Sequence, residues 1–411
     1  MVVRILFPVI IAVAWLLLLQ STMITDVWDE THFLVYFYTQ SNTIWDKLAI
    51  IWTQPIGHLY RPIPISIASI ILEQVSLSPF AWQLLRAINI ILLLGTLASF
   101  LYVFWRWQVK AYLFPIFTIL FLFSGSSFIS SAWFVNLFDV MSLFLFSCAL
   151  VLISHELFLI AGIVIGVSFF CKEISLLFAI FLIIMLINKK IHIRSFIQVI
   201  IPILILGISY WVLRFNIADY SSQNDIYNFS WETYGTSLFG FLESFWWQNM
   251  QRIQDMYWFG IICLILSIFA FKTDTNRLLF TGFILFSSLI YWQMFIFYQH
   301  DVIHYLHFIG RLYLIPTALF LLALVLWARS IIFVLIAIPI LLGGWQTYHA
   351  HQRFQYVFHQ IEQLSQKQTS VFIHFPDHKG QINDPFKKIY IGNYPQAQYK
   401  IDIKQGLLIE Q

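Results

Sequence analysis

The chain has 411 residues, of which 60% are hydrophobic, 19% are aromatic and only 10% are charged. A soluble domain has roughly a quarter of its residues charged, so this composition excludes the soluble globular class. The net charge of +3 is small, and the basic residues fall in short clusters between apolar runs, which argues for membrane topology and against nucleic-acid binding. The runs are too long for barrel strands, so we expect an all-α polytopic membrane protein.

Apolar runs long enough to span a membrane recur along the chain, since a span needs about 20 apolar residues. The first run follows Arg4 and has no small-residue cleavage site behind it, so we expect an uncleaved helix rather than a signal peptide. In all, about eleven spans are predicted, near 4–24, 80–105, 111–129, 135–153, 157–171, 174–188, 195–214, 256–271, 278–298, 308–327 and 330–347.

The charges between these spans separate by sign. One side of the predicted membrane receives basic residues, namely Arg4, Arg106, Lys110, Lys189, Lys190, Arg194, Lys272, Arg277 and Arg329. The other side receives acidic residues, namely Asp26, Asp29, Glu30, Asp46, Asp219, Asp225, Glu232, Glu243, Asp255 and Asp301. The basic side is cytoplasmic by the positive-inside rule, so the N-terminus is expected inside and the C-terminus outside. An error of one span would break this separation.

Two regions outside the spans are long enough to form structure of their own. The first outer loop, 25–79, contains two runs with helical spacing, 31–52 and 63–75, which we expect to lie along the outer membrane surface. Residues 348–411 begin with a polar helix and continue with short β-like runs. We therefore expect a transmembrane module over 1–347 and a small extracytoplasmic α+β tail over 348–411.

An acidic pair, Asp29 and Glu30, stands directly after the first span, with His32 close behind. One interpretation is a helix start, with Asp29 as the N-cap and Glu30 in the first turn. The other is chemical, because carboxylates at the end of a span can deprotonate an acceptor hydroxyl or hold a divalent cation such as Mg²⁺ or Mn²⁺. The role of His32 stays open.

Further charges lie close to or between spans. Arg61, beside Tyr60, is suited either to phosphate oxygens or to reaching the lipid headgroups. Asp139 stands near the outer end of a span, and Lys172 and Glu173 stand between two spans, where they form either a site or a structural ion pair. A charge in the apolar zone costs roughly 2.5–3.5 kcal/mol on insertion scales, so such residues are usually kept for a site or a partner.

A late outer segment carries His300, His304 and His307 at helical spacing, followed by Arg311 and Tyr313. Three histidines on one helical face could bind a metal ion, but no cysteine accompanies them, and we do not predict a metal site there. Arg311, at the outer start of a span, is the better candidate for binding a lipid phosphate.

These segments together resemble the GT-C fold glycosyltransferases, the polytopic class that uses polyprenyl-phosphate sugar donors. The segment from Asp29 to Phe33 is similar to the acidic motif in the first outer loop of protein O-mannosyltransferases and lipid A aminoarabinose transferases. Segments similar to those of transmembrane O-mannosyltransferases that carry tetratricopeptide repeats are Tyr60-Arg61-Pro62, Arg86 with Asn89, and Lys172-Glu173, and Arg311 with Tyr313 and Pro316 is like the segment opening a late span.

The resemblance implies a GT-C-like fold and an inverting glycosyltransferase of the bacterial inner membrane that works on the extracytoplasmic face. Asp29 would be the general base on an acceptor hydroxyl, with Glu30 orienting it. The resemblance assigns the donor phosphate to Arg311, Lys172 and Arg61, and a supporting role to Asp139, Glu173, His32, Tyr60 and Tyr313. The partners would be the lipid-linked sugar and a glycolipid, glycan or protein acceptor, and a metal would be optional.

Two other classes remain open from the residues alone. A transporter or flippase of lipid-linked envelope precursors also places basic residues along a lipid pathway, although it more often has two similar halves, which this sequence lacks. A scaffold subunit would leave the charged motifs without purpose. The discriminating observation is whether Asp29, Lys172 and Arg311 converge on one outward-facing cavity. The chain contains no tetratricopeptide array and no large outer domain, so the resemblance does not identify the acceptor.

Overall fold

The computed structural model describes most of the chain. The described residues are 2–20, 43–54, 60–75, 79–132, 136–217, 257–299, 313–367, single positions between 231 and 245, and the strands and adjoining residues at 371–374, 382–384, 389–392, 397–402 and 407–410. The predicted motif residues Asp29, Glu30, His32 and Arg311 lie outside these ranges.

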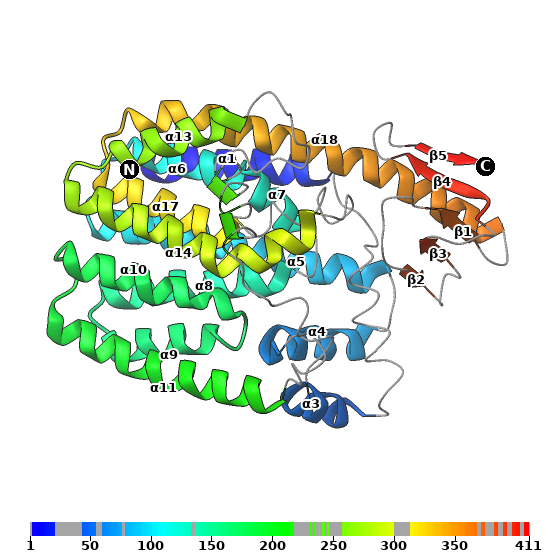
Figure 1. Ribbon diagram of the computed structural model, residues 1–411, viewed down its shortest axis with the longest axis horizontal. Coiled ribbons are helices and arrows are strands. Elements are labelled where there is room, and N and C mark those ends of the chain that lie inside the picture. The colour runs from blue at the N-terminus through cyan, green and yellow to red at the C-terminus, as the bar shows by residue number, and fades with distance from the viewer. Residues whose placement is uncertain are drawn as a thin grey trace.

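Helices make up nearly all of the described bundle, which confirms the all-α expectation for the membrane module (Figure 1). A helix lies in each of the eleven ranges in which a span is expected. The bounds are α1 Val2–Gln20, α5 Pro79–Arg106, α6 Leu113–Leu122, α7 Gly125–Ala132, α8 Leu137–Ser154, α9 Phe158–Ser168, η2 Glu173–Ser175, α10 Leu176–Ile187, α11 Ile193–Ile217, α13 Tyr257–Phe269, α14 Asp274–Gln299, α17 Leu314–Trp327 and α18 Ile332–Lys367.

Four of the described helices are long and apolar enough to cross a membrane. These segments are Gln83–Arg106, Leu137–Ser154, Ile193–Asn216 and Ile332–His349. A fifth is added if α6 and α7, whose axes differ by 59°, form one broken span. The other apolar helices found are 10–17 residues long. The membrane class is therefore supported, and the number eleven remains a prediction.

The centre of the bundle is α17, in which every residue except Leu326 is buried. A helix that is apolar all round belongs in an interior, as α17 does. By contrast, α11 exposes a row of large aliphatic side chains, Ile197, Ile201, Leu204, Ile205, Ile208 and Val212. A contiguous exposed apolar face of this kind is typical of contact with lipid.

Small residues bring α9 and α11 into close contact. A Cβ added at Gly162 would lie 2.3 Å from the Val199 backbone oxygen, and one added at Gly166 would lie 2.6 Å from a Leu206 methyl carbon. The two glycines are four residues apart, so they lie on one face of α9. Small residues at this spacing let helix backbones approach in membranes, where apolar burial does not itself drive association.

The basic residues predicted on the cytoplasmic side gather at one end of the bundle. At this end the Arg106 guanidinium donates to the Ser154 carbonyl at 3.1 Å, which joins the C-terminal ends of α5 and α8. The Arg329 backbone N–H donates to Ala270 at 2.9 Å, and Lys190 lies 5.6 Å from the Trp107 ring. In Figure 1 this is the left-hand end, where the N-terminus also lies. Arg4 follows the N-terminus closely in the sequence.

The first loop contains the two expected helices, at least in the part that the structure describes. They are α3 Ile44–Thr53 and α4 Pro62–Val75, and the second matches the expected 63–75 closely. Thr43 caps α3 by accepting from the Asp46 backbone N–H at 3.2 Å. The Lys47 ammonium pairs with Glu73 at 2.5 Å and so joins the two helices. Their orientation along a membrane surface remains a prediction.

The C-terminal tail contains a helix and strands, as predicted, but it does not begin where we expected. The expected last span and the expected polar helix are one helix, α18, so the predicted boundary at 347/348 falls inside a helix. A five-stranded sheet of order β2-β3-β1-β4-β5 follows, built from β1 Val371–His374, β2 Ile382–Asp384, β3 Ile389–Gly392, β4 Tyr399–Asp402 and β5 Leu407–Glu410.

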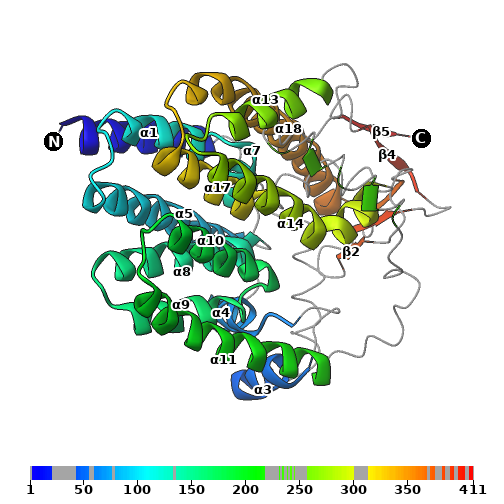
Figure 2. The same cartoon turned by 60° about the vertical axis from the view of Figure 1, so that its left-hand side comes forward.

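The sheet is mixed. β1 pairs in parallel with β3 and β4, and the two outer pairs are antiparallel. α18 contacts β1 and β5, and the buried Val371 and Ile373 of β1, with Val357 and Ile361 of α18, supply a small core there. Figures 1 and 2 both show the strands at the end of the molecule opposite the N-terminus.

The close packing of α9 on α11 gives a stability prediction. Gly162→Ala would bring a methyl group against the Val199 oxygen, and overpacking of this kind costs about 1–3 kcal/mol. Gly282→Ala is the matched control, because a Cβ there meets nothing within 4 Å and alanine is the better helix former. In detergent, a thermal unfolding temperature that falls for Gly162→Ala and holds or rises for Gly282→Ala would support this packing. Equal temperatures for the two variants would contradict it.

Candidate functional site

A break between α9 and α10 presents Lys172 and Glu173 to the interior. α9 ends at Ser168, Lys172 takes an extended conformation, and a short 3-10 turn, η2, leads into α10. Serine hydroxyls hold the break, because Ser175 donates to the Ser168 carbonyl at 2.9 Å and lies 2.7 Å from the Ser142 hydroxyl of α8. Serine side chains that bond the backbone locally compete with continuous helix, which favours an interruption here.

The first ion pair joins this break to α8. The Lys172 ammonium donates to Asp139 Oδ2, and both side chains are almost completely buried, with 3% and 2% of their surface exposed. Asp139 stands in the first turn of α8, where the helix dipole favours a carboxylate. Its second oxygen, Oδ1, is buried and makes no hydrogen bond to any residue in the described ranges.

The second group is a bridge of three charged side chains from distant parts of the chain. The Arg61 guanidinium donates to both Glu173 oxygens, at 2.7 and 3.2 Å. Arg214, near the end of α11, lies 3.3 Å from the Glu173 carboxylate. This bridge fastens the segment before α4, the α9–α10 connection and α11 to one another.

Aromatic side chains enclose this bridge. The Tyr210 hydroxyl donates to the Tyr60 carbonyl at 3.1 Å and accepts from the Arg214 guanidinium at 3.1 Å. The Tyr60 and Tyr210 rings stack with centroids 5.9 Å apart, and the Arg61 guanidinium lies 5.0 Å from the Phe138 ring centroid. A guanidinium held between a carboxylate and a ring has little freedom, so this arginine is rigidly positioned.

The ion pairs keep the buried charges in place. Burial alone would lower the pKa of Arg61, but the Glu173 charge and hydrogen bonds raise it above its ordinary value. Burial alone would raise the pKa of Glu173, but Arg61 and Arg214 hold it well below its ordinary value. Among the described residues, three cations, Arg61, Lys172 and Arg214, thus pair with two carboxylates, Asp139 and Glu173. Cations held in place by carboxylates in a dry environment are preorganised to interact with an anion that enters.

The structure brings together four of the predicted site residues. Arg61, Asp139, Lys172 and Glu173 meet at the end of the bundle opposite the basic residues, and Tyr60 joins them through its carbonyl group. The Tyr313 hydroxyl donates to the Phe241 carbonyl at 3.3 Å. Asp29, Glu30, His32 and Arg311 lie outside the described residues, and so do His300, His304 and His307.

Two residues of this group were missed in the sequence. Arg214 and Tyr210 lie in a long apolar run, and Arg214 was assigned to neither side of the membrane. The signal was present, because a lone arginine within an apolar helix needs a partner. Arg86 is another arginine within an apolar helix, and its side chain is fully buried. Its neighbour Leu85 packs in one apolar cluster with Cys171, the residue before Lys172.

No group of three or more metal-ligating side chains occurs among the residues that the structure describes. The residues predicted to hold an optional divalent cation, Asp29 and Glu30, are outside that part of the chain. No family model matches this chain, and comparison with curated proteins and with solved structures found no match.

The buried ion pair between Lys172 and Asp139 gives a second stability prediction. Lys172→Met would leave Asp139 charged and unpaired in the interior, at a cost of about 3–5 kcal/mol. The double variant Lys172→Met/Asp139→Leu removes both charges and should recover most of that stability in detergent. If the double variant unfolds as readily as Lys172→Met, the pair is not the cause of the loss.

Proposed function

We propose that this protein is a GT-C-type glycosyltransferase that moves a sugar from a polyprenyl phosphate to an acceptor hydroxyl at the extracytoplasmic face of a bacterial inner membrane. The observation that carries the proposal is the buried cluster in which Arg61, Lys172 and Arg214 are held in place by Asp139 and Glu173. A lipid phosphate that leaves during transfer gains negative charge, and preorganised cations in a water-poor site stabilise such charge best.

The membrane arrangement that the proposal needs has eleven spans. It is supported by the helices found in all eleven expected ranges and by the basic residues gathered at the end of the bundle away from the cluster. On α11, Arg194 and Arg214 are separated by about 30 Å at 1.5 Å per residue, which is the thickness of the hydrocarbon core. With the basic end in the cytoplasm, the cluster lies at the outer face.

The chemistry is a single displacement. Asp29 accepts the proton of the acceptor hydroxyl while the hydroxyl oxygen bonds to the anomeric carbon. The bond from that carbon to the phosphate oxygen breaks on the opposite side, so the anomeric configuration inverts and polyprenyl phosphate leaves. Arg311 binds the phosphate directly, with Lys172 and Arg61 contributing positive charge, and Glu30 orients Asp29.

Lys172 and Arg61 contribute from within ion pairs rather than as free cations. Lys172 is paired with Asp139 and Arg61 with Glu173, and Arg214 is a third cation beside Glu173. The carboxylates keep the cations charged and oriented before the donor enters.

A deletion strain tests the activity and the base together. Envelope glycolipids and glycoproteins of the deletion strain should lack one sugar by mass spectrometry, and the wild-type gene should restore it. Asp29→Asn removes the proton acceptor and should restore none of that sugar, although the variant protein reaches the membrane at the wild-type level.

Asp46→Asn is the matched control for this experiment, because Asp46 is an exposed carboxylate of the same loop whose contact among the described residues is with the α3 cap residue Thr43. It should restore the sugar fully. An unchanged envelope in the deletion strain would reject the glycosyltransferase, and full restoration by Asp29→Asn would reject Asp29 as the base.

Arg311 is tested separately by donor affinity. Arg311→Ala removes a charge-assisted hydrogen bond to the phosphate, and we expect the apparent affinity for the lipid-linked sugar to fall by roughly tenfold to a hundredfold. Arg329→Ala is the control, since Arg329 lies at the basic end of the bundle. Equal affinities in the two variants would remove Arg311 from the donor site.

One observation favours a transporter or flippase as the second candidate. The 59° bend between α6 and α7 is typical of the broken helices on which transporters build their binding sites. Transporters usually place a second break in the matching half, and α6–α7 is the one bent pair among the described helices. Transport without transfer would leave the sugar on its lipid, which the same mass spectrometry detects.

A further inference from the structure

A cavity of about 640 Å³ lies at the basic end of the bundle, far from the charged cluster. α1 contributes Arg4, Ile5, Pro8 and Val9, α5 contributes Ala98, Leu101, Tyr102 and Trp105, and α6 contributes Phe114. Along α5, Trp105 stands about 28 Å from the buried Arg86 by the helical rise, so the cavity and Arg86 lie toward opposite ends of that helix.

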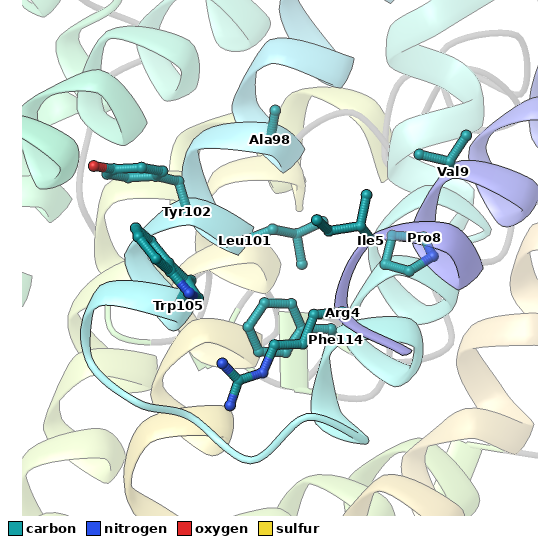
Figure 3. A pocket seen from close by; sticks show the side chains of 9 residues that line it. All are labelled: Arg4, Ile5, Pro8, Val9, Ala98, Leu101, Tyr102, Trp105 and Phe114. Atoms are coloured by element: carbon teal, nitrogen blue, oxygen red, sulfur yellow. The ribbon is translucent and has the colours of Figure 1, made fainter. Parts of the chain in front are cut away.

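The walls of the cavity are apolar and face outward. Ile5 and Val9 of α1 and Trp105 of α5 each have about half of their surface exposed. Figure 3 shows Leu101 and Ile5 facing one another across the middle of the cavity, with Tyr102 and Trp105 forming one side. Its volume falls within the roughly 300–1,000 Å³ of ordinary ligand sites, and its apolar lining suits a hydrocarbon chain.

The mouth of the cavity carries one charged group with its donors available. The Arg4 guanidinium lies 5.6 Å from the Phe114 ring centroid, which fixes its position. No residue in the described ranges pairs with Arg4 by a salt bridge or a hydrogen bond. In Figure 3 the Arg4 guanidinium and the indole nitrogen of Trp105 lie on the same side of the cavity. Two N–H donors beside an apolar channel suit a phosphate attached to an acyl chain.

Two other polar side chains on this part of α5, Tyr102 and Arg106, already have hydrogen-bond partners within the protein. The Tyr102 hydroxyl lies 2.8 Å from the His155 ring nitrogen, and the Tyr102 and His155 rings stack. Arg106, next to Trp105, donates to the Ser154 carbonyl. These contacts hold α5 in place without using Arg4 or the Trp105 nitrogen, so the pair is left to an external anion.

Charge at this end also favours an anionic ligand. The described residues here include the cations Arg4, Arg106, Lys110, Lys189, Lys190, Arg194, Lys272, Arg277 and Arg329, and the carboxylates Glu156 and Asp274. Asp274 is neutralised by Arg277 at 2.5 Å. Basic residues at a membrane surface attract anionic lipids by about 1 kcal/mol each.

We propose that this cavity binds an anionic phospholipid of the surrounding membrane, with its phosphate on Arg4 and Trp105 and one acyl chain between α1 and α5. This site is independent of the proposed transfer reaction. It would fix α1, the helix that leads directly into the acidic segment at 26–30, against the rest of the bundle.

Native mass spectrometry of the full-length protein in mild detergent tests the site, with phosphatidylglycerol as the anionic probe and phosphatidylcholine as the zwitterionic one. The wild type should retain phosphatidylglycerol in preference to phosphatidylcholine. Arg4→Gln should weaken phosphatidylglycerol binding by roughly tenfold, the effect of losing one charge-assisted hydrogen bond. Arg4→Lys, which keeps the charge, should retain most of the binding.

Arg194→Gln is the matched control, because it removes the same charge from the same end without touching the cavity. Ala98→Phe tests the cavity itself, since Ala98 is exposed on α5 and a ring there would fill the channel while leaving Arg4 unchanged. The proposal is overturned if Arg4→Gln binds phosphatidylglycerol as well as Arg194→Gln does, if Ala98→Phe binds as well as the wild type, or if both lipids bind equally.

Discussion

The arrangement of this protein depends on matching buried charges within an apolar bundle. Glu173 accepts from Arg61 and pairs with Arg214, and beside it Lys172 pairs with Asp139. Leaving any of these charges without a partner in such surroundings would be unfavourable, because desolvation costs several kcal/mol per ion. Their partners come from the first loop, α8 and α11, so the pairing determines how those segments assemble.

The same requirement explains why the chain is interrupted where it is. A continuous helix through α9 and α10 would place Lys172 and Glu173 on neighbouring positions of one cylinder. The break at Ser168, with its serine hydrogen bonds, instead lets the two side chains reach separate partners. A hydrogen-bonded connection that brings together three cations and two carboxylates is the kind of feature that functional sites retain.

Packing and electrostatics act at different places along the helices. Gly162 and Gly166 let α9 and α11 approach at their middle, where only van der Waals contact is available. The charges stand at the ends, the matched cluster at one and the basic residues at the other. A largely apolar bundle with basic residues gathered at one end would, by the positive-inside rule, be expected to place that end in the cytoplasm.

Much of the fold could be predicted from the residues. The composition determined the helical membrane class, and apolar run lengths placed a helix in every expected range, because a helix in lipid must satisfy its own backbone and leaves a long local signal. The same local reasoning placed Lys172 and Glu173 between helices and Asp139 at a helix start. It could not separate a capping role from a catalytic one for Asp29, since both use the same residue in the same local pattern.

Only the tertiary structure decided which charges meet. Arg61 and Glu173 are 112 residues apart, and Arg214 was passed over within an apolar run until its carboxylate partner was found on another element. The join of the last span to the polar helix in α18 was also missed, because a helix continues through a change in polarity as long as no residue breaks its backbone. Pairing between distant residues leaves no periodic trace in a sequence, so it is determined by packing alone.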